Sequence, residues 1–495
     1  MRQVFTRIGK AICLILLFVS LAAVFAEDWL VRSWADLSAD EVIFHTKVSL
    51  EGSNPQMIKE VLLVYVSRGV LIFYLLILLF WLLRKKLPVL YNLRYPIWLF
   101  LSLCILGFSI ARLETSSKLP GTIARWLLVS EDDTDFVAQH YTEPRESILH
   151  FPEQKRNLIY IFLESTEVTF TDRQSGGAFE QNCLPELTKL AKENECFAGN
   201  SGMIAGATSL EGSIWTMGAI FAQTSGLPLQ VSPFSGMLDT DGGFFPKAVT
   251  MGDILKDAGY RQSFLLGSKA GFGGRESYFR HHGDFEIKDY DWAVRERKIP
   301  QDYYVWWGFE DEKLFTLAKE EIEAASREDT PFCITMLTVD THFPDGYLEE
   351  NSEKPFGDDQ YANVFASEDQ RVAELIEWLK SRGLYENTTI VLAGDHPTMD
   401  ADFCDNVDRS YDRSVYVSVI NGAQSPKKLT RRRYSTMDLF PTTLAALGVS
   451  IEGERLGLGT NLYSEKPTLI EEFGIDTCNR ELSKPSLFLQ SLTQH

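Results

Sequence analysis

Acidic and imidazole side chains follow three separate apolar runs of the sequence, at the point where each run ends. "NLIYIFLES" ends with Glu164 in its last two residues, and "TIVLAGDH" ends in Asp395 and His396. "CITMLTVDTH" carries Asp340 and His342. Carboxylate oxygens and imidazole nitrogens together bind divalent transition metals. Each motif alone is also typical of a solvated turn, but chance seldom places such groups behind three apolar runs. We therefore predict one metal site assembled from these segments.

The three runs read as strands of a parallel sheet that helices cover on both faces. They are continuous apolar stretches with β-branched residues, which is typical of strands buried on both sides. "YRQSFLLG" reads as a further strand, and helical patterns alternate with the strands, among them "LPELTKLAKE", "AVTMGDILKDAG", "SEDQRVAELIEWLKSRGL" and "DLFPTTLAALGV". Ligands of such α/β sheets bind beyond the carboxyl ends of the strands, where the acidic and imidazole groups lie. The expected fold class is α/β, with a mainly parallel sheet flanked by helices.

Residues 1–111 read as a transmembrane region. They contain apolar segments at about 8–27, 61–83 and 95–111, which suit three membrane helices. The first segment also resembles a cleaved signal peptide, but three spans in succession favour a membrane helix. Lys and Arg precede the first segment and lie between the second and third, so the positive-inside rule places everything after residue 111 outside. We expect a multi-pass protein of the cell (inner) membrane with an extracytoplasmic catalytic domain.

The remaining chain divides by composition. Residues 112–156 are charged and irregular and read as a linker, 157–470 as the catalytic domain, and 471–495 as a C-terminal tail. The net charge of −20, from 48 Lys and Arg against 68 Asp and Glu, argues against a nucleic-acid partner, which would require a basic face. Cys183 and Cys196 flank a helical segment and either form a disulfide or remain thiols.

Four segments together resemble the lipoteichoic acid synthase and phosphoglycerol transferase I family of the alkaline phosphatase and sulfatase superfamily. They are "NLIYIFLESTE", "TVDTHFPDG", "LAGDHPTM" and "LGLGTNL", within a likeness from about Asp135 to Leu462. The resemblance implies that Glu164, Asp395 and His396 bind one divalent metal ion together with a nucleophilic hydroxyl. Mn²⁺ is the first choice, with Zn²⁺ and Mg²⁺ as alternatives. It also implies that His342 contacts the phosphoryl group.

The nucleophile has two candidates. Members of the family carry a Thr thirteen residues before the Gly of a segment that matches "AQTSGLPL". Counting thirteen residues back from Gly226 gives Ser213, whose hydroxyl a metal can also activate. Ser213 would also suit the N-cap of the helix "IWTMGAIFAQ", whose N-terminus favours phosphate. Thr208 in "GATS" is the competitor. We take Ser213 as the catalytic hydroxyl and a metal ligand.

Arg275 is the expected substrate-binding residue. It lies in the Gly-rich stretch "GSKAGFGGRESYFRHHG", where the backbone can approach a ligand closely. A guanidinium group binds phosphate oxygens in a bidentate manner, and the resemblance implies a basic residue near this position.

The expected activity is the transfer of glycerophosphoryl groups from phosphatidylglycerol to an extracytoplasmic glycan or glycerophosphate polymer, through a covalent Ser or Thr intermediate. A phosphoethanolamine transferase would use the same site. A sulfatase-type hydrolase would need a Cys-x-Pro-x-Arg pattern, which "CLPEL" at Cys183 lacks. A non-catalytic membrane receptor is the remaining alternative, and the presence of every candidate ligand argues against it.

Overall fold

The computed structural model describes residues 2–33, 38–116, 135–145, 148–199, 202–232, 235–238, 243–400, 402–428 and 430–493. The chain forms two compact units. The first unit comprises Met1–Ala39 and Ser53–Ile123, and the second comprises Asp40–Gly52 and Ala124–His495. The short segment Asp40–Gly52 thus belongs to the second unit, although it lies between the first two apolar segments of the sequence.

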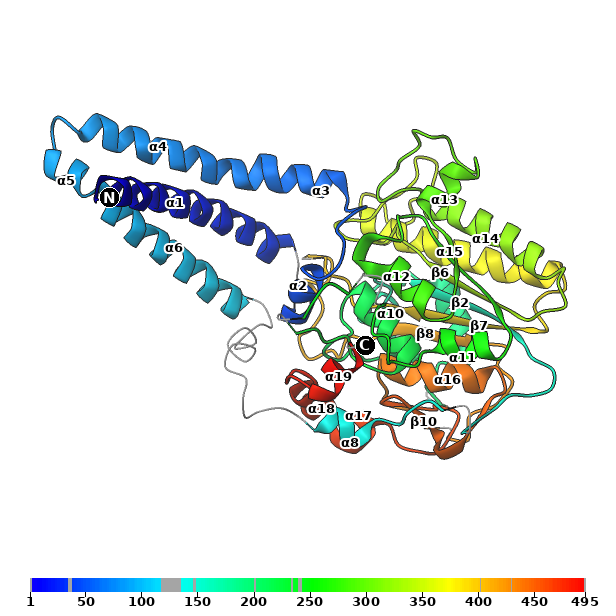
Figure 1. The fold of residues 1–495 in the computed structure, drawn as a ribbon. Coiled ribbons are helices and arrows are strands. Elements are labelled where there is room, and N and C mark those ends of the chain that lie inside the picture. Colours follow the sequence, from blue (N-terminus) through cyan, green and yellow to red (C-terminus); the bar gives the residue numbers. More distant parts are fainter. Residues whose placement is uncertain are drawn as a thin grey trace. The chain divides into compact units, whose positions relative to one another are not determined.

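The first unit is helical and apolar (Figure 1). Its helices are α1 (Arg2–Ser33), α3 (Pro55–Glu60), the π-helix η1 (Val61–Val66), α4 (Ser67–Leu83), α5 (Pro88–Asn92) and α6 (Arg94–Ser116). Three stretches are long and apolar enough to cross a membrane, namely Arg7–Trp29, Met57–Leu83 and Arg94–Arg112. They confirm the three expected apolar helices.

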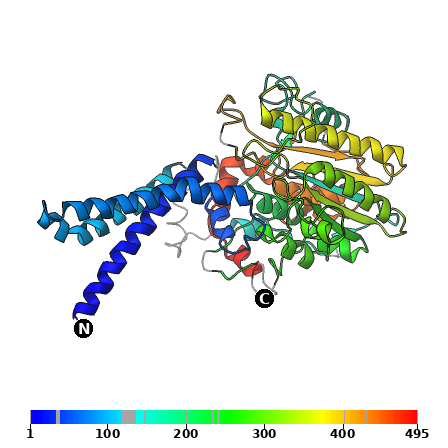
Figure 2. The ribbon, with the colours of Figure 1, turned by 90° about the horizontal axis from the view of Figure 1, so that it is seen from above.

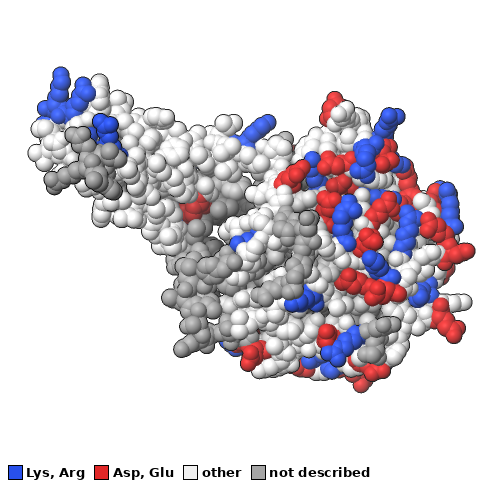
Figure 3. Space-filling view, in the orientation of Figure 1, with Lys and Arg blue, Asp and Glu red and all other residues white. Residues whose placement is uncertain are grey.

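A small core holds these helices together, with the side chains of Leu17, Leu21, Phe80 and Trp98 buried in it. Other apolar side chains point outward, and Leu63 is 72% exposed. The surface of this unit in Figure 3 is mostly white, with Lys and Arg side chains mainly at one end, whereas acidic and basic side chains are frequent on the visible face of the second unit. Outward apolar surface on this scale is expected where lipid replaces water as the solvent.

The second unit is built on a seven-stranded sheet in the order β3-β8-β7-β2-β6-β4-β5. Its strands are β2 (Asn157–Leu163), β3 (Gly206–Ala207), β4 (Arg261–Leu266), β5 (Glu286–Lys288), β6 (Phe332–Leu337), β7 (Thr388–Gly394) and β8 (Val415–Ile420). The five strands from β7 to β5 are parallel. Nearly all side chains of β2, β6 and β7 are buried, which explains their continuous apolar runs.

Helices cover both faces of this sheet (Figures 1 and 2). One layer contains α9 (Pro185–Glu193), α14 (Asp311–Ala325) and α15 (Gln360–Ser381). The opposite layer contains α10 (Thr216–Ser225), α11 (Met251–Asp257) and α16 (Leu439–Ala446). The expected α/β class and mainly parallel sheet are therefore confirmed.

The remaining elements are short. They are α2 (Ala39–His45), α8 (Phe136–His140), α12 (Arg275–His281), α13 (Tyr290–Arg295), α17 (Leu469–Phe473), α18 (Ile475–Leu482), α19 (Leu487–Leu492), β1 (Leu149–His150), β9 (Ser450–Ile451), β10 (Arg455–Leu456) and β11 (Gly459–Thr460). Within the described ranges, short 3-10 turns lie at Val168–Phe170, Phe272–Gly274, Thr436–Asp438 and Glu452–Glu454.

One edge of the sheet differs from the expected parallel pattern. β8 pairs antiparallel with β7, and the short β3 pairs antiparallel with β8. Every residue of β8 is buried, so its sequence has the same continuous apolar character as the parallel strands. A continuous apolar run therefore indicates that a strand is buried on both faces, but it does not indicate whether the strand is parallel or antiparallel.

Parts of the expected linker and tail carry regular structure. Residues 117–134 and 146–147 of the expected linker lie outside the described residues, but α8 precedes β1, and β1 pairs with β9. In the expected tail, Glu471 accepts a hydrogen bond from the buried Arg432, 2.9 Å from Nε. Gln230 donates to the carbonyl oxygens of Leu482 (3.2 Å) and Lys484 (2.9 Å). These segments thus pack as parts of the second unit. Cys183 and Cys196 are free thiols, so the disulfide alternative is wrong.

Candidate metal centre and active site

The pairing register of the sheet brings Glu164 and Asp395 together. β2 and β7 are parallel neighbours, and Leu163 pairs with Gly394 in their last register position. The next residue of each strand, Glu164 and Asp395, therefore leaves the sheet at the same level. A Cβ on Gly394 would lie 2.0 Å from the carbonyl oxygen of Thr166, so only glycine fits at this close approach.

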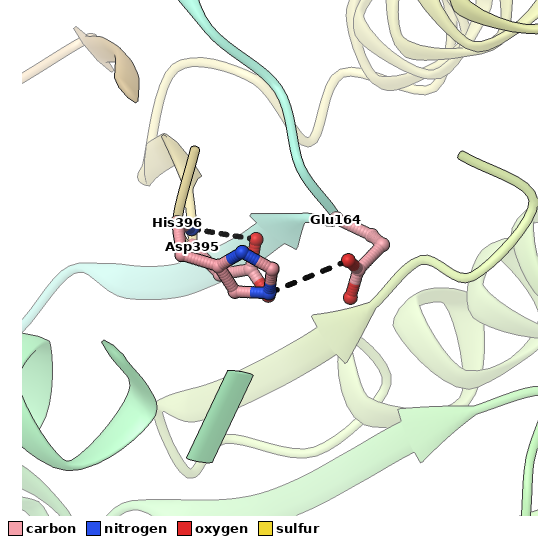
Figure 4. A group of neighbouring side chains, drawn as sticks. All are labelled: Glu164, Asp395 and His396. Atoms are coloured by element: carbon pink, nitrogen blue, oxygen red, sulfur yellow. Dashed lines mark hydrogen bonds and ion pairs between the residues drawn. The ribbon is translucent and has the colours of Figure 1, made fainter. Parts of the chain in front are cut away.

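His396 completes a buried group with these two carboxylates (Figure 4). Its Nε2 lies 3.5 Å from Glu164 Oε1 and 3.4 Å from Asp395 Oδ2. Its Nδ1 lies 2.9 Å from the carbonyl oxygen of Pro397. A carbonyl oxygen can only accept, so Nδ1 carries a proton, and in the neutral ring Nε2 keeps its lone pair. That lone pair is directed toward the two carboxylates.

The backbone around the group holds the carboxylates in place. Asp395 Oδ1 accepts from the backbone N–H of Ser165 (2.8 Å) and of His396 (2.7 Å). Ser165 also donates from its hydroxyl to Glu164 Oε1 at 2.7 Å. Ser165 has a φ of 54°, in the left-handed region that non-glycine residues seldom occupy. Strain of this kind costs about 1–3 kcal/mol and persists where the surrounding structure enforces it.

The charges of the three groups depend on one another. Burial raises the pKa of Asp395, and the Glu164 carboxylate adds to this, so the pKa of Asp395 reaches about 8. Burial also opposes ionisation of Glu164, but His396 and His342 outweigh it and lower the pKa of Glu164. Burial disfavours the charged form of His396, but Asp395 and then Glu164 raise the pKa of His396. The group therefore attracts positive charge strongly.

These residues fit a divalent cation. Each of Glu164, Asp395 and His396 offers one ligand atom, and these atoms all lie within 4.8 Å of one another. The buried Asp395 Oδ2 has no hydrogen-bond partner among the described residues, which a cation would provide. Carboxylate oxygens together with an imidazole nitrogen suit Mn²⁺ or Zn²⁺. The structure thus brings together three of the four residues that the sequence analysis named as metal ligands, namely Glu164, Asp395 and His396, but not Ser213.

The hydroxyl that faces this group belongs to Thr216, which the sequence analysis missed. Thr216 Oγ1 lies 3.3 Å from His396 Nε2 and 3.5 Å from Glu164 Oε2. Thr216 is the first residue of α10, whose N-cap is Trp215. The N-terminus of a helix has unpaired backbone N–H groups and a positive dipole end, which favour a phosphate.

Ser213 lies elsewhere, contrary to our expectation. Its side chain is fully buried, and its hydroxyl donates to the carbonyl oxygen of Leu210 at 2.7 Å. It also accepts a hydrogen bond from Thr436 at 3.2 Å. Ser213 is not the N-cap either, because α10 begins three residues later. The backbone of Thr208 pairs with Tyr434 and Thr436, which fixes this loop against a neighbouring one.

The length of α10 and its C-cap glycine could have indicated Thr216. α10 has ten residues and ends at Gly226, which adopts the left-handed C-cap conformation with φ 68°. Counting back one helix length from this glycine reaches Thr216, whereas thirteen residues reach beyond the helix to Ser213. Thr216 also has the residue type that the family resemblance implies, so the substitution of Ser for Thr is not needed.

His342 lies beside the group on the loop after β6. Its Nδ1 is 2.7 Å from the carbonyl oxygen of Phe343, so Nδ1 carries a proton and Nε2 of the neutral ring can accept one. Burial lowers the pKa of His342, although the Glu164 carboxylate opposes this. The ring packs between Trp307 and Phe343, with both centroid distances at 4.8 Å.

Arg275 is buried at the start of α12, close enough to Glu164 for the two charges to interact. Burial lowers the pKa of Arg275 to about 10, so the guanidinium stays charged at neutral pH. Its Nε donates to the carbonyl oxygen of Phe272 (2.9 Å) and its Nη2 to that of Lys269 (3.0 Å). Its Nη1 has no hydrogen bond within the described ranges, and it is the nitrogen left to bind a ligand.

Asp340 does not join the group, although it follows β6. Its Oδ2 accepts from the backbone N–H of Asp311 at 3.0 Å and lies 3.7 Å from Arg371 Nη1. Asp340 thus belongs to a separate buried network of carboxylates around Arg371. From the third strand end, His342 interacts electrostatically with Glu164, and Thr341 Oγ1 donates to the carbonyl oxygen of Glu164 at 2.6 Å.

The chain belongs to the sulfatase family, whose model matches residues 156–449. It is similar to phosphoglycerol transferase I of Xanthomonas campestris pv. campestris (strain B100), with 30% identity over 334 residues, 66% of this chain and 45% of that protein. The corresponding protein of Salmonella choleraesuis (strain SC-B67) is 30% identical over 344 residues, 68% of this chain and 42% of that protein. The chain thus spans less than half the length of these relatives.

Among solved structures, the integral membrane protein lipooligosaccharide phosphoethanolamine transferase A (EptA) from Neisseria meningitidis has a similar fold. The TM-score is 0.53 at 13% identity, over 91% of this chain and 87% of that chain. At this identity the similarity concerns the fold alone.

We predict that Asp395→Ala removes the bound metal. The substitution deletes a charged ligand and leaves two of three protein ligands, so the coordination sphere is incomplete. Metal content of the purified full chain, measured by mass spectrometry after dialysis against Mn²⁺, should fall to background. Asp345→Ala, which changes an exposed Asp outside the group, is the control. Wild-type metal content in Asp395→Ala would rule the site out.

We predict that Thr216→Ala abolishes turnover while metal content stays within about twofold of wild type, because three protein ligands remain. Thr216→Ser keeps a hydroxyl at the same place and should retain measurable activity. Ser213→Ala is the matched control on the same loop, and it should affect folding stability more than turnover. Release of diacylglycerol from labelled phospholipid is the readout. Loss of activity in Ser213→Ala together with an active Thr216→Ala would return the nucleophile to Ser213.

Proposed function

We propose that this protein is a membrane-bound, metal-dependent phosphoglycerol transferase. It moves glycerophosphoryl groups from phosphatidylglycerol to an extracytoplasmic glycan or glycerophosphate polymer. The observation that carries the proposal is the Thr216 hydroxyl at the N-terminus of α10, within 3.5 Å of both Glu164 and His396. A hydroxyl beside a cation-binding group and a helix N-terminus is suited to attack a phosphodiester. The names of the curated relatives support the glycerophosphoryl group.

Glu164, Asp395 and His396 would hold a divalent ion, for which we propose Mn²⁺. When bound, such an ion lowers the pKa of a hydroxyl beside it and offsets negative charge on a phosphoryl group. Because Nδ1 of His396 donates to Pro397, its Nε2 is fixed toward the ion. The backbone N–H groups of Ser165 and His396 orient Asp395 in the same way.

In the first half-reaction, Thr216 Oγ1 attacks the phosphorus of phosphatidylglycerol. Its bond to phosphorus forms as the bond from phosphorus to the diacylglycerol oxygen breaks, and the proton that Oγ1 loses is taken up by that oxygen. Nη1 of Arg275 binds a phosphoryl oxygen, and the N-terminus of α10 contributes its dipole. These charges stabilise the transition state more than the ground state, because negative charge on the phosphoryl oxygens must be neutralised as the group transfers.

In the second half-reaction, a hydroxyl of the acceptor attacks the same phosphorus as the bond from phosphorus to Thr216 Oγ1 breaks, and Oγ1 receives the proton that the acceptor loses. The neutral Nε2 of His342 accepts the proton of the acceptor, since Nδ1 already donates to Phe343. The lowered pKa of His342 keeps the ring neutral and able to accept this proton near neutral pH. We therefore propose that His342 contacts the phosphoryl group and acts as the base in this step.

Two alternative enzymes use the same fold. A sulfatase-type hydrolase with a cysteine nucleophile is disfavoured, because Cys183 is buried before α9 and burial raises its pKa to about 12. Such a thiol is not reactive near neutral pH. A phosphoethanolamine transferase would need the same metal and nucleophile, and differs only in the head group that it accepts.

The donor decides between the transferases. The purified full chain with Mn²⁺ is incubated with labelled phosphatidylglycerol or phosphatidylethanolamine and an oligosaccharide acceptor. We expect diacylglycerol release and acceptor labelling from phosphatidylglycerol, and less than about a tenth of this from phosphatidylethanolamine, as a head-group contact worth 1.4 kcal/mol would give. Turnover of phosphatidylethanolamine alone would establish the alternative. Bound metal without turnover of either lipid would support a receptor.

We also propose that the first unit crosses the membrane three times and that the second unit lies outside the cytoplasm. Arg84, Lys85 and Lys86 follow α4 and are exposed, and they would stay on the cytoplasmic side. A phosphatase reporter fused after Leu462 should be active, and a fusion after Lys86 inactive. The reverse pattern would overturn the orientation.

A further inference from the structure

The segment Asp40–Gly52, called here the 40–52 segment, packs into the second unit. It contains α2 and the turn after it (Figure 1). Phe44 is fully buried, and its ring lies 6.1 Å from the rings of both Trp215 and Phe244. Trp215 is the N-cap of α10 and directly precedes Thr216. The segment therefore contacts the residue that sets where the nucleophile's helix begins.

The same segment covers the turn that holds Arg275. This turn, Lys269–Gly274, supplies both carbonyl oxygens that accept from the guanidinium, those of Lys269 and Phe272. The position of Arg275 Nη1 therefore depends on where these two residues lie, because a guanidinium is a rigid planar fork.

Each part of that turn touches the 40–52 segment. The ring of His45 is stacked on the ring of Phe272, with centroids 5.9 Å apart and an interplanar angle of 27°. The Lys269 ammonium lies 3.7 Å from Glu51 Oε1.

The backbone of the turn is tied down as well. The N–H of Gly273 donates to the carbonyl oxygen of Ser49 at 3.3 Å. A Cβ on Gly274 would lie only 3.1 Å from Val48 Cγ1, so the turn and the 40–52 segment are in direct contact.

A row of rings continues from His45 to the candidate active site. Phe272 lies 5.5 Å from Trp307, and Trp307 lies 4.8 Å from His342. Burial and the nearby charge of Arg275 together lower the pKa of His45 to about 4, so its ring is neutral at physiological pH. A neutral imidazole packs on an aromatic ring without adding a charge that would repel Arg275.

We propose that the 40–52 segment is a wall of the active site and that His45 is a positioning residue, which holds Phe272 and thereby aims Arg275 at the phosphodiester. The neighbouring Phe44 supports Trp215 at the start of α10 in the same way. Substrate recognition by the second unit thus requires a segment that the sequence places between two apolar helices. The inference rests on the proposed function only in taking Arg275 as the ligand of the phosphodiester.

The kinetic test uses the full-length protein with whichever phospholipid the wild type turns over. His45→Ala should lower kcat/KM for the lipid by about tenfold or more, as expected when a binding group shifts by a fraction of an ångström to 1 Å. His45→Phe keeps the stacked ring and should recover most of the activity. Val42→Ala, an exposed position on the same helix, is the matched control and should equal wild type.

The combination with Arg275→Ala separates positioning from general damage. If His45 acts through Arg275, His45→Ala in the Arg275→Ala background should change kcat/KM by less than about twofold, because the shared interaction is already lost. A full additional tenfold loss in that background, or equal activity of His45→Ala and wild type, would overturn the proposal.

Hydrogen–deuterium exchange needs no substrate, so it tests the position of the 40–52 segment whichever phospholipid is the donor. In hydrogen–deuterium exchange, the peptide containing Gly273 should exchange faster in His45→Ala than in wild type, and as in wild type in His45→Phe and Val42→Ala. Turnover of phosphatidylethanolamine in place of phosphatidylglycerol would refute the proposed function and leave this comparison valid. Unchanged exchange at Gly273 in His45→Ala would refute the wall, even in a protein that turns over neither lipid.

Discussion

Burial of two carboxylates side by side is the constraint on which the rest of the second unit depends. Glu164 and Asp395 are both removed from water, and the Glu164 carboxylate also raises the pKa of Asp395. Such a pair is stable as two anions only if positive charge lies between them, since an uncompensated buried charge costs several kcal/mol. His396 provides one such charge when protonated, and a divalent ion would provide more while releasing that proton. The same constraint accounts for the backbone N–H groups of Ser165 and His396, which donate to Asp395.

The sheet meets this constraint through register rather than through side-chain packing alone. Adjacent parallel strands end at the same level, so one pairing, Leu163 with Gly394, places both acids. A slip by one residue would turn every side chain of the strand to the opposite face and separate them. The fully buried apolar residues of β2 and β7 resist that slip. The hydrophobic stability of the sheet thus holds a strained and charged group at its edge, including the left-handed Ser165.

The sequence predicted the central strands and most of the residues behind them, but it misplaced Asp340 and did not resolve positions that a loop decides. Apolar runs predicted the central strands, and the residues that follow them included Glu164, Asp395, His396 and His342. This works because the carboxyl ends of parallel strands lie side by side at one edge of the sheet. The position of the proposed nucleophile depends on where a helix starts within a loop, and Ser213 and Thr216 differ there by less than one turn. Periodicity does not resolve such a difference. Only the hydroxyl contacts of Thr216 with Glu164 and His396 do.

The 40–52 segment is a second feature that the sequence pattern did not predict, because it packs in a different unit from the residues on either side of it. Its neighbours in sequence, Ala39 and Ser53, belong to the first unit, whereas its side chains pack in the second. No periodic pattern in the sequence predicts this packing, because a short helix with one buried Phe looks like an ordinary connection between two apolar helices. Yet it contacts both the residue before Thr216 and the turn that holds Arg275. Thr216 and Arg275, which we propose as nucleophile and anion-binding group, are therefore linked through one segment whose neighbours in sequence belong to the first unit.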